Sequence, residues 1–91
     1  MKTFITYKVF YSKESKKFIK KHKIEGLKFF DAFKEIAENS LNLSKYDVKI
    51  YKGFQNQFRL RIGNFRAIFE IENDILTIVV IKIGSRGDIY K

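Results

Sequence analysis

The clearest pattern in the chain is a pair of strand-like runs around Gly63-Asn64. QFRLRI precedes this pair and FRAIFEIE follows it, and both runs alternate between apolar and polar or charged residues. A two-residue connection with glycine first is typical of a β-hairpin. With this loop, Ile62 lies opposite Phe65, Arg61 opposite Arg66, Leu60 opposite Ala67 and Phe58 opposite Phe69.

Alternation along the two strands separates apolar from basic side chains. The apolar face holds Phe58, Leu60, Ile62, Phe65, Ala67 and Phe69, and the other face holds Arg59, Arg61 and Arg66. Like charges directly opposite each other are unfavourable in a sheet. The pairing of Arg61 with Arg66 therefore suggests a face that meets an anion.

The N-terminal part predicts one strand followed by two helices. The strand covers Tyr7–Tyr11, and residues 1–6 could extend it. Ser12 suits a helix N-cap, and this first helix runs to about Lys21. The second helix covers Ile24 to about Asn39, and its phenylalanines are expected in the core. Its apolar residues recur at a spacing of three or four: Leu27, Phe30, Phe33 and Ala37.

Residues 41–47 are polar and suggest a loop, and residues 47–52 suggest a short strand or an extended lead-in that ends at Gly53. After the hairpin, Asn73-Asp74 predicts a second turn, and Ile75–Ile83 predicts a central strand because it is apolar on both faces. Gly84 is expected to end this strand, and a terminal tail follows.

The facing of the last strand stays open. A two-residue turn at Asn73-Asp74 puts Thr77, Val79 and Ile81 on the arginine side, and one residue more reverses this. The order of elements predicts an α+β fold, with an N-terminal strand and two helices packed on a mostly antiparallel sheet of about four strands. The 91 residues suffice for one domain covering 1–91.

The charge balance favours a polyanionic partner. The chain has 19 Lys and Arg against 10 Asp and Glu, a net charge of +9. Nucleic acid, an acidic membrane surface or an acidic protein would suit this charge, and a merely solubilising surface is the alternative. There is no Cys, no apolar run long enough to cross a membrane and no visible secretory signal. A cytoplasmic protein that does not enter membranes is therefore expected.

The arginines of the hairpin, joined by Arg86 from the tail, could hold a phosphodiester and stabilise charge in its transition state. Tyr90 beside them suits stacking on a base. The alternative is a solvated sheet face whose arginines pair with Glu70 and Glu72. His22 is the only histidine, so a His/Cys metal site or a Ser-His-Asp triad is not expected.

The first helix carries a second basic surface. Its lysines either form a solvated face or contact the nucleic acid backbone without sequence preference. The candidates for RNA binding are Lys13, Lys16, Lys17 and Lys20.

Two motifs resemble those of the RelE toxins in the RelE/ParE superfamily. They are R-x-G-x-[FY]-R at residues 61–66 and G-x-R-x-D-[IV]-Y at residues 84–90, and the opening YKVFYSKESKKFIKKH also resembles the family's first strand and lysine-rich helix. The resemblance covers about Tyr7 to Tyr90. It implies a toxin that enters the ribosomal A site and cuts mRNA there through the ribose 2′-OH, without a metal or another cofactor. It also implies a cognate antitoxin as partner.

By this resemblance, Arg66 and Arg86 bind the scissile phosphate, Arg59 and Arg61 orient it, and Tyr90 stacks on a base. RelE toxins often carry lysines where this chain has Arg59 and Arg61. An arginine is always protonated and is a poor general base. Lys52 or Glu70 could accept the proton instead, or the site could work by positioning and charge stabilisation. The alternative function within the superfamily is a ParE-like inhibitor of DNA gyrase without catalysis.

Overall fold

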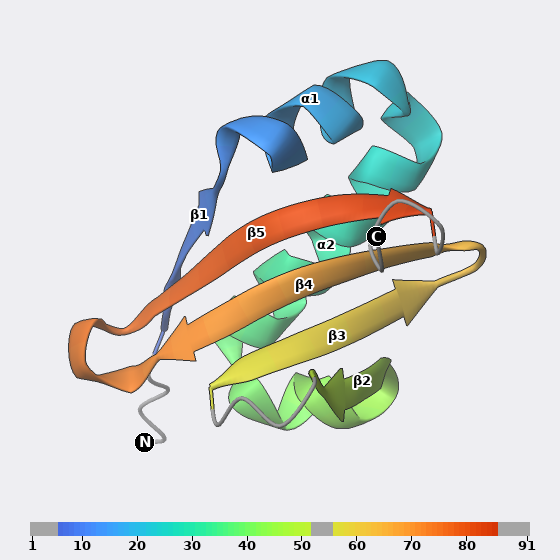
Figure 1. The fold of residues 1–91 in the computed structure, drawn as a ribbon. Helices are drawn as coiled ribbons and strands as arrows, with labels where there is room; N and C mark the ends of the chain where they lie inside the picture. The colour runs from blue at the N-terminus through green and yellow to red at the C-terminus, as the bar shows by residue number, and fades with distance from the viewer. Residues whose placement is uncertain (1–5, 52–55, 86–91) are drawn as a thin grey trace.

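The computed structural model describes residues 6–51 and 56–85. Two helices and five strands form two layers, a sheet and a helical layer behind it (Figure 1). The helices are α1 (Lys13–Lys21) and α2 (Lys23–Glu38). The strands are β1 (Lys8–Tyr11), β2 (Asp47–Ile50), β3 (Gln57–Ile62), β4 (Phe65–Glu72) and β5 (Thr77–Ser85). The predicted α+β class is confirmed.

The sheet has the strand order β1-β5-β4-β3-β2, so it contains five strands where about four were expected. The pairs β2–β3, β3–β4 and β4–β5 are antiparallel, and β1 pairs with β5 in parallel. β5 lies inside the sheet, as its apolar sequence predicts. Figure 1 shows α2 behind β4 and β5, so the helices cover one face of the sheet only.

The first helix begins as the sequence predicts. The side chain of Ser12 accepts a hydrogen bond from Ser15 N, which is the N-cap arrangement. Glu14 lies in the first turn, where its negative charge complements the helix dipole. Phe18 is buried and fixes the helix on the core.

The second helix buries Phe33 and Ala37 of the expected stripe but not Leu27 and Phe30. Phe29, Phe33 and Ile36 are buried and Gly26 lies against α1, whereas Leu27 and Phe30 are 59% and 47% exposed. Both sets have helical spacing, and contact with the sheet decides between them. The prediction that all phenylalanines of this helix enter the core was wrong for Phe30, which stacks near Tyr11 at 6.0 Å between ring centroids.

Two connections differ from the prediction. Residues predicted as a loop form a 3₁₀ helix, Ser40–Lys45, whose start is capped by the Asn39 side chain. The β4–β5 connection is a short 3₁₀ helix at Asn73–Ile75 followed by Leu76 in a left-handed conformation (φ 48°). It is therefore longer than the predicted two-residue turn by two residues, and Thr77 and Val79 stay on the arginine side.

The core lies between the sheet and the helices. Its largest fully buried side chains include Phe29, Phe33, Phe69, Ile78 and Val80. Phe33 meets Phe69 edge to face at 5.0 Å between ring centroids, so the hairpin is packed directly on α2. This packing holds the apolar face of the hairpin inward and turns its arginines away from the helices.

Candidate functional site

The hairpin has the predicted register. Arg61 is paired with Arg66, Leu60 with Ala67 and Ile62 with Phe65. Gly63 has φ +59°, a left-handed value that glycine adopts without strain. Leu60, Ala67 and Phe69 are buried in the core, and the arginines lie on the opposite face of the sheet. The predicted separation of apolar and basic faces is confirmed.

Two rows of paired residues cross four strands on this arginine face. The first row is Asp47, Arg61, Arg66 and Gly84, and the second row is Lys49, Arg59, Ile68 and Lys82, each from β2, β3, β4 and β5 in turn. Paired residues on neighbouring strands point to the same side of a sheet. The two rows therefore gather five basic side chains and one carboxylate.

The sequence reasoning missed Lys49 and Lys82. Alternation along the short strand β2 could have placed Lys49 opposite Arg59. The position of Lys82 on this face depends on an irregularity in the strand pairing. Phe69 pairs with Val80, but Ile68 pairs with Lys82, so Ile81 is an extra residue in β5. Gly84 was expected to end the strand, but β5 continues through it to Ser85.

The arginines differ in their surroundings. Arg59 Nη2 lies 3.3 Å from Asp47 Oδ1, and the Arg59 side chain is 17% exposed. Its Nε is buried and has no hydrogen-bond partner among the described residues. Arg61 is exposed and its Nε donates a 3.4 Å hydrogen bond to Gly63 O. Arg66 is half-buried. Arg59 is thus held in place by Asp47, which sequence reasoning had not linked to it, and Arg61 is open to solvent.

The far end of β4 is acidic. Glu70 shares the arginine face, as predicted, and accepts a 2.7 Å hydrogen bond from Gln57 Nε2. Glu72 accepts a 3.1 Å hydrogen bond from Asn56 Nδ2. Hydrogen bonding and charge repulsion from Glu70, together with desolvation, raise the pKa of Glu72. Arg59 pairs with Asp47 on this face, and Glu70 and Glu72, the pairing partners in the alternative interpretation, accept hydrogen bonds from side-chain amides.

The remaining predicted residues are not part of this arrangement. Figure 1 shows α1 on the far side of β5 from the strands of the hairpin, β3 and β4, and the lysines of this helix are exposed: Lys13, Lys16, Lys17 and Lys20. Arg86, Tyr90 and Lys52 lie outside the described residues. Among the described residues, no group of three His, Cys, Asp or Glu side chains could hold a metal ion.

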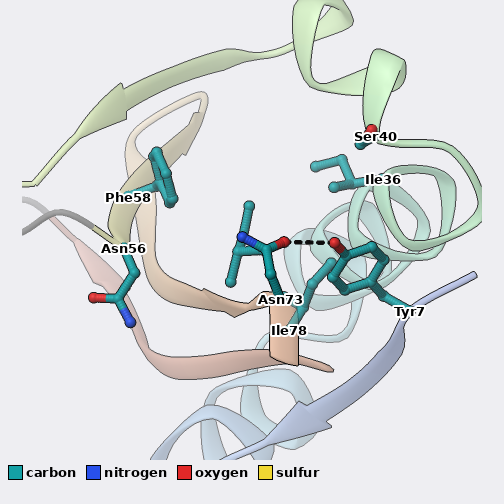
Figure 2. A pocket seen from close by; sticks show the side chains of 8 residues that line it. Tyr7, Ile36, Ser40, Asn56, Phe58, Asn73 and Ile78 are labelled. Atoms are coloured by element: carbon teal, nitrogen blue, oxygen red, sulfur yellow. Dashed lines mark hydrogen bonds between the residues drawn. The ribbon is translucent and has the colours of Figure 1, made fainter. Parts of the chain in front are cut away.

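A cavity of about 220 Å³ lies on the other side of the sheet, between β5 and the end of α2. Ile36, Phe58 and Ile78 contribute apolar walls (Figure 2). The Tyr7 hydroxyl donates a 2.5 Å hydrogen bond to Asn73 Oδ1, and Figure 2 shows these two side chains pointing toward each other. None of the described residues that line this cavity is basic, so the arginine face is the stronger candidate for binding an anion.

None of the helices in residues 6–51 and 56–85 is long and apolar enough to cross a membrane.

Comparisons with known proteins agree with the fold. A curated relative, toxin RelE3 of Methanocaldococcus jannaschii, is 42% identical over 52 residues, which is 57% of this chain and 57% of that toxin. The match thus spans less than two thirds of that relative. The RelB–RelE antitoxin–toxin complex of Methanococcus jannaschii contains a chain with a TM-score of 0.70 and 26% identity, covering 89% of this chain and 94% of that one.

The archaeal RelE–RelB complex of Pyrococcus horikoshii OT3 gives a TM-score of 0.75 at 24% identity, covering 90% of this chain and 97% of that one, and it supports the fold alone. The model of the family described as ParE toxin of the type II toxin–antitoxin system parDE matches residues 9–90. The chain therefore belongs to the ParE toxin family, within the RelE/ParE superfamily of type II toxin–antitoxin toxins.

Proposed function

We propose that this toxin is a ribosome-dependent mRNA endoribonuclease that inhibits translation. The observation that carries the proposal is the pairing of Arg61 with Arg66 on the sheet face opposite α2. Two arginines at directly opposed positions of a hairpin can offer guanidinium groups to the oxygens of one phosphodiester. The resemblance to RelE toxins and the relatedness to RelE3 support the same activity.

The proposed reaction is transfer within the RNA. The 2′-oxygen bonds to the adjacent phosphorus while the bond from phosphorus to the 5′-oxygen of the next nucleotide breaks. The products are a 2′,3′-cyclic phosphate and a free 5′-hydroxyl. The 2′-OH loses its proton and the departing 5′-oxygen gains one, so no other reactant is consumed. Arg61 and Arg66 stabilise the extra negative charge on the phosphate oxygens as the reaction proceeds.

Glu70 and Lys52 are the candidates for the proton acceptor. Glu70 lies four residues from Arg66 on β4, roughly 13 Å along an extended strand. A phosphate held between Arg61 and Arg66 is thus farther from Glu70 than from the second row. Arg86 and Tyr90 keep the roles that the family resemblance gives them, phosphate binding and base stacking. Lys52, the nearest lysine upstream of the hairpin, stays a candidate for the proton acceptor.

We further propose that a cognate antitoxin covers part of this chain, since related chains were solved as antitoxin–toxin complexes. The outer side of α2 exposes an apolar stripe, with Ile24 at 70%, Leu27 at 59% and Phe30 at 47%. A groove of about 270 Å³ adjoins it between Phe30 and Tyr11. Contiguous exposed apolar surface of this kind marks interaction sites.

The test is controlled expression followed by mapping of cleavage sites in translated mRNA. The wild-type chain is expected to arrest growth and to produce cuts only in translated messages. Arg66→Ala should reduce cleavage by about 10²–10³-fold, the usual cost of losing one group that stabilises transition-state charge. A folded wild-type chain that leaves translated mRNA intact would refute the proposal.

Inhibition of DNA gyrase is the second candidate, because the matching family model is that of ParE toxins. A supercoiling assay with purified gyrase separates the two activities. Inhibited supercoiling together with intact mRNA would establish the gyrase activity in place of RNA cleavage.

A further inference from the structure

The extra residue in β5 brings a lysine to the arginine face. Ile78 and Val80 point into the core, so strict alternation would also direct residue 82 inward. The register shift at Ile81 changes this, since Lys82 pairs with Ile68 and Ile83 becomes the buried residue, at 5% exposure. Lys82 therefore lies in the second row, beside the arginines.

This irregularity is fixed by the start of α1. Val80 O accepts hydrogen bonds from Ser12 N and from Ser15 Oγ, both at 3.0 Å. Ile81 O lies 2.6 Å from Ser12 Oγ, which donates to it. A bulge interrupts the ladder between strands and leaves backbone groups that need other partners. Because α1 supplies these partners, the position of Lys82 on the arginine face is a built feature of the fold.

The second row is a separate basic position from the first row. Ile68 at its centre is 5% exposed although it does not belong to the helix-facing core. The aliphatic parts of Arg59 and Lys82, its partners on either side, are suited to cover it while their charged ends remain available. Lys49 lies at the β2 end of the row. The row thus holds three basic side chains, two of which lie on either side of Ile68.

The spacing of the two rows matches the repeat of a nucleic acid backbone. Arg59 and Arg61 are two residues apart on β3, as are Arg66 and Ile68 on β4. Two residues of a strand span about 6.6 Å. This distance is comparable with the separation of successive phosphates in an extended single strand.

We propose that the second row binds the phosphate next to the scissile one, so that the toxin requires single-stranded RNA with two successive phosphates. This inference rests on the proposed function and extends it from one phosphate to two. In this arrangement Arg59 and Lys82 contact the neighbouring phosphate, and Asp47 orients Arg59 through their 3.3 Å ion pair. Lys82 contributes a cation to binding and takes no part in bond breaking.

The experiment is a double-mutant cycle between protein and RNA. The probe is a short single-stranded RNA with a 2′-methoxy group at the scissile position, which prevents cleavage. Two modified probes carry a methylphosphonate in place of one flanking phosphate. In the first the replaced phosphate is on the 5′ side of the scissile one, and in the second it is on the 3′ side. Binding of wild-type and Lys82→Ala chains is measured against salt concentration, with Lys34→Ala on α2 as the control of equal charge.

Lys82→Ala is expected to weaken binding of the native probe about tenfold, as for a charge-assisted hydrogen bond. It should also reduce the slope of log K against log salt by about 0.7, the value for one phosphate contact on a single strand. One of the two methylphosphonate probes should bind wild type more weakly than the native probe does. The loss caused by this methylphosphonate should be smaller for Lys82→Ala, in which Arg59 alone still contacts that phosphate. Lys82→Arg should retain wild-type binding, and Lys34→Ala should match wild type.

Additive losses from Lys82→Ala and from both methylphosphonates would overturn the inference, as would a Lys82→Ala chain that binds like wild type. Loss of binding in a folded Lys82→Arg chain would also overturn the inference, because a positive charge at position 82 would then not suffice for binding the phosphate. Cleavage of translated mRNA by the wild-type chain, measured in parallel, tests the proposed function separately. In that assay Lys82→Ala should raise KM and leave kcat unchanged.

Discussion

Gly26 lies where the two helices approach each other most closely. A Cβ atom at this position would come within 2.7 Å of Ile19 Cα and 3.0 Å of Ile19 O, both backbone atoms of α1. Neither atom can move without shifting the helix. The glycine therefore permits the close approach of α1 and α2, and with it the burial of Phe18 against Phe29.

Replacing Gly26 with alanine tests this residue-level constraint. Alanine favours a helix by about 1 kcal/mol over glycine, whereas overpacking costs about 1–3 kcal/mol. We expect Gly26→Ala to lower the free energy of unfolding by about 1–2 kcal/mol in urea titrations. Lys28→Ala, at an exposed position of the same helix, should change it by less than about 0.5 kcal/mol. A more stable Gly26→Ala chain would show that the helix propensity of alanine outweighs the close contact of its Cβ atom with Ile19.

At the scale of elements, α1 and β5 depend on each other through two serines. Ser15 is fully buried and donates to Val80 O at 3.0 Å. Ser12 caps α1 and also donates to Ile81 O. The N-terminus of the helix and the bulge thus satisfy each other's backbone groups, which explains a buried polar residue in an otherwise apolar layer.

Ser15→Ala should destabilise the fold by about 1–2 kcal/mol, because it removes a buried hydrogen bond. Ser44→Ala is the matched control. Its hydroxyl also donates to a backbone oxygen, Leu41 O, at 3.0 Å, but in an exposed position. Unfolding in urea should show little change for Ser44→Ala. Equal losses for both variants would indicate that burial of the Ser15 bond has no special effect.

The acidic end of β4 gives a pH dependence of stability. The raised pKa of Glu72 means that folding favours its protonated form. This contribution is present below the ordinary glutamate pKa and is lost as the pH rises through the raised value. We therefore expect Glu72→Gln to raise the urea midpoint at pH 7 and to leave it unchanged at pH 4. Glu38→Gln on α2 serves as the control. If the urea midpoint of Glu72→Gln at pH 7 were below that of wild type, the repulsion between Glu70 and Glu72 would be contradicted.

Across the whole molecule, the parts set by local sequence were predictable. The short glycine turn and the alternation of period two determine the hairpin register, so the pairing of Arg61 with Arg66 follows from the sequence. The parts set by contacts between layers were not. Two stripes of α2 have equal helical spacing, and only packing against the sheet chooses Phe29 over Phe30. Lys82 was missed because an extra residue in β5 has no sequence signal of its own.

The two-layer arrangement also separates stability from function, and the arginines of the site allow this to be tested. Arg61 is exposed opposite Arg66, and like charges in directly opposed positions destabilise a sheet. Arg61→Gln should therefore keep the free energy of unfolding or raise it by up to about 1 kcal/mol, while mRNA cleavage falls. Arg59→Gln is the informative comparison, because its ion pair with Asp47 and its 17% exposure tie it to the fold.

Loss of the Asp47 ion pair leaves a carboxylate without its cation, so Arg59→Gln should lower the free energy of unfolding as well as cleavage. Urea unfolding and cleavage of translated mRNA, measured on both variants, give the answer. If Arg61→Gln destabilised the chain as much as Arg59→Gln, Arg61 would be a structural residue. Full stability of Arg61→Gln together with lost cleavage is the expected result. It would indicate that the two opposed arginines serve to bind the phosphate and do not stabilise the sheet.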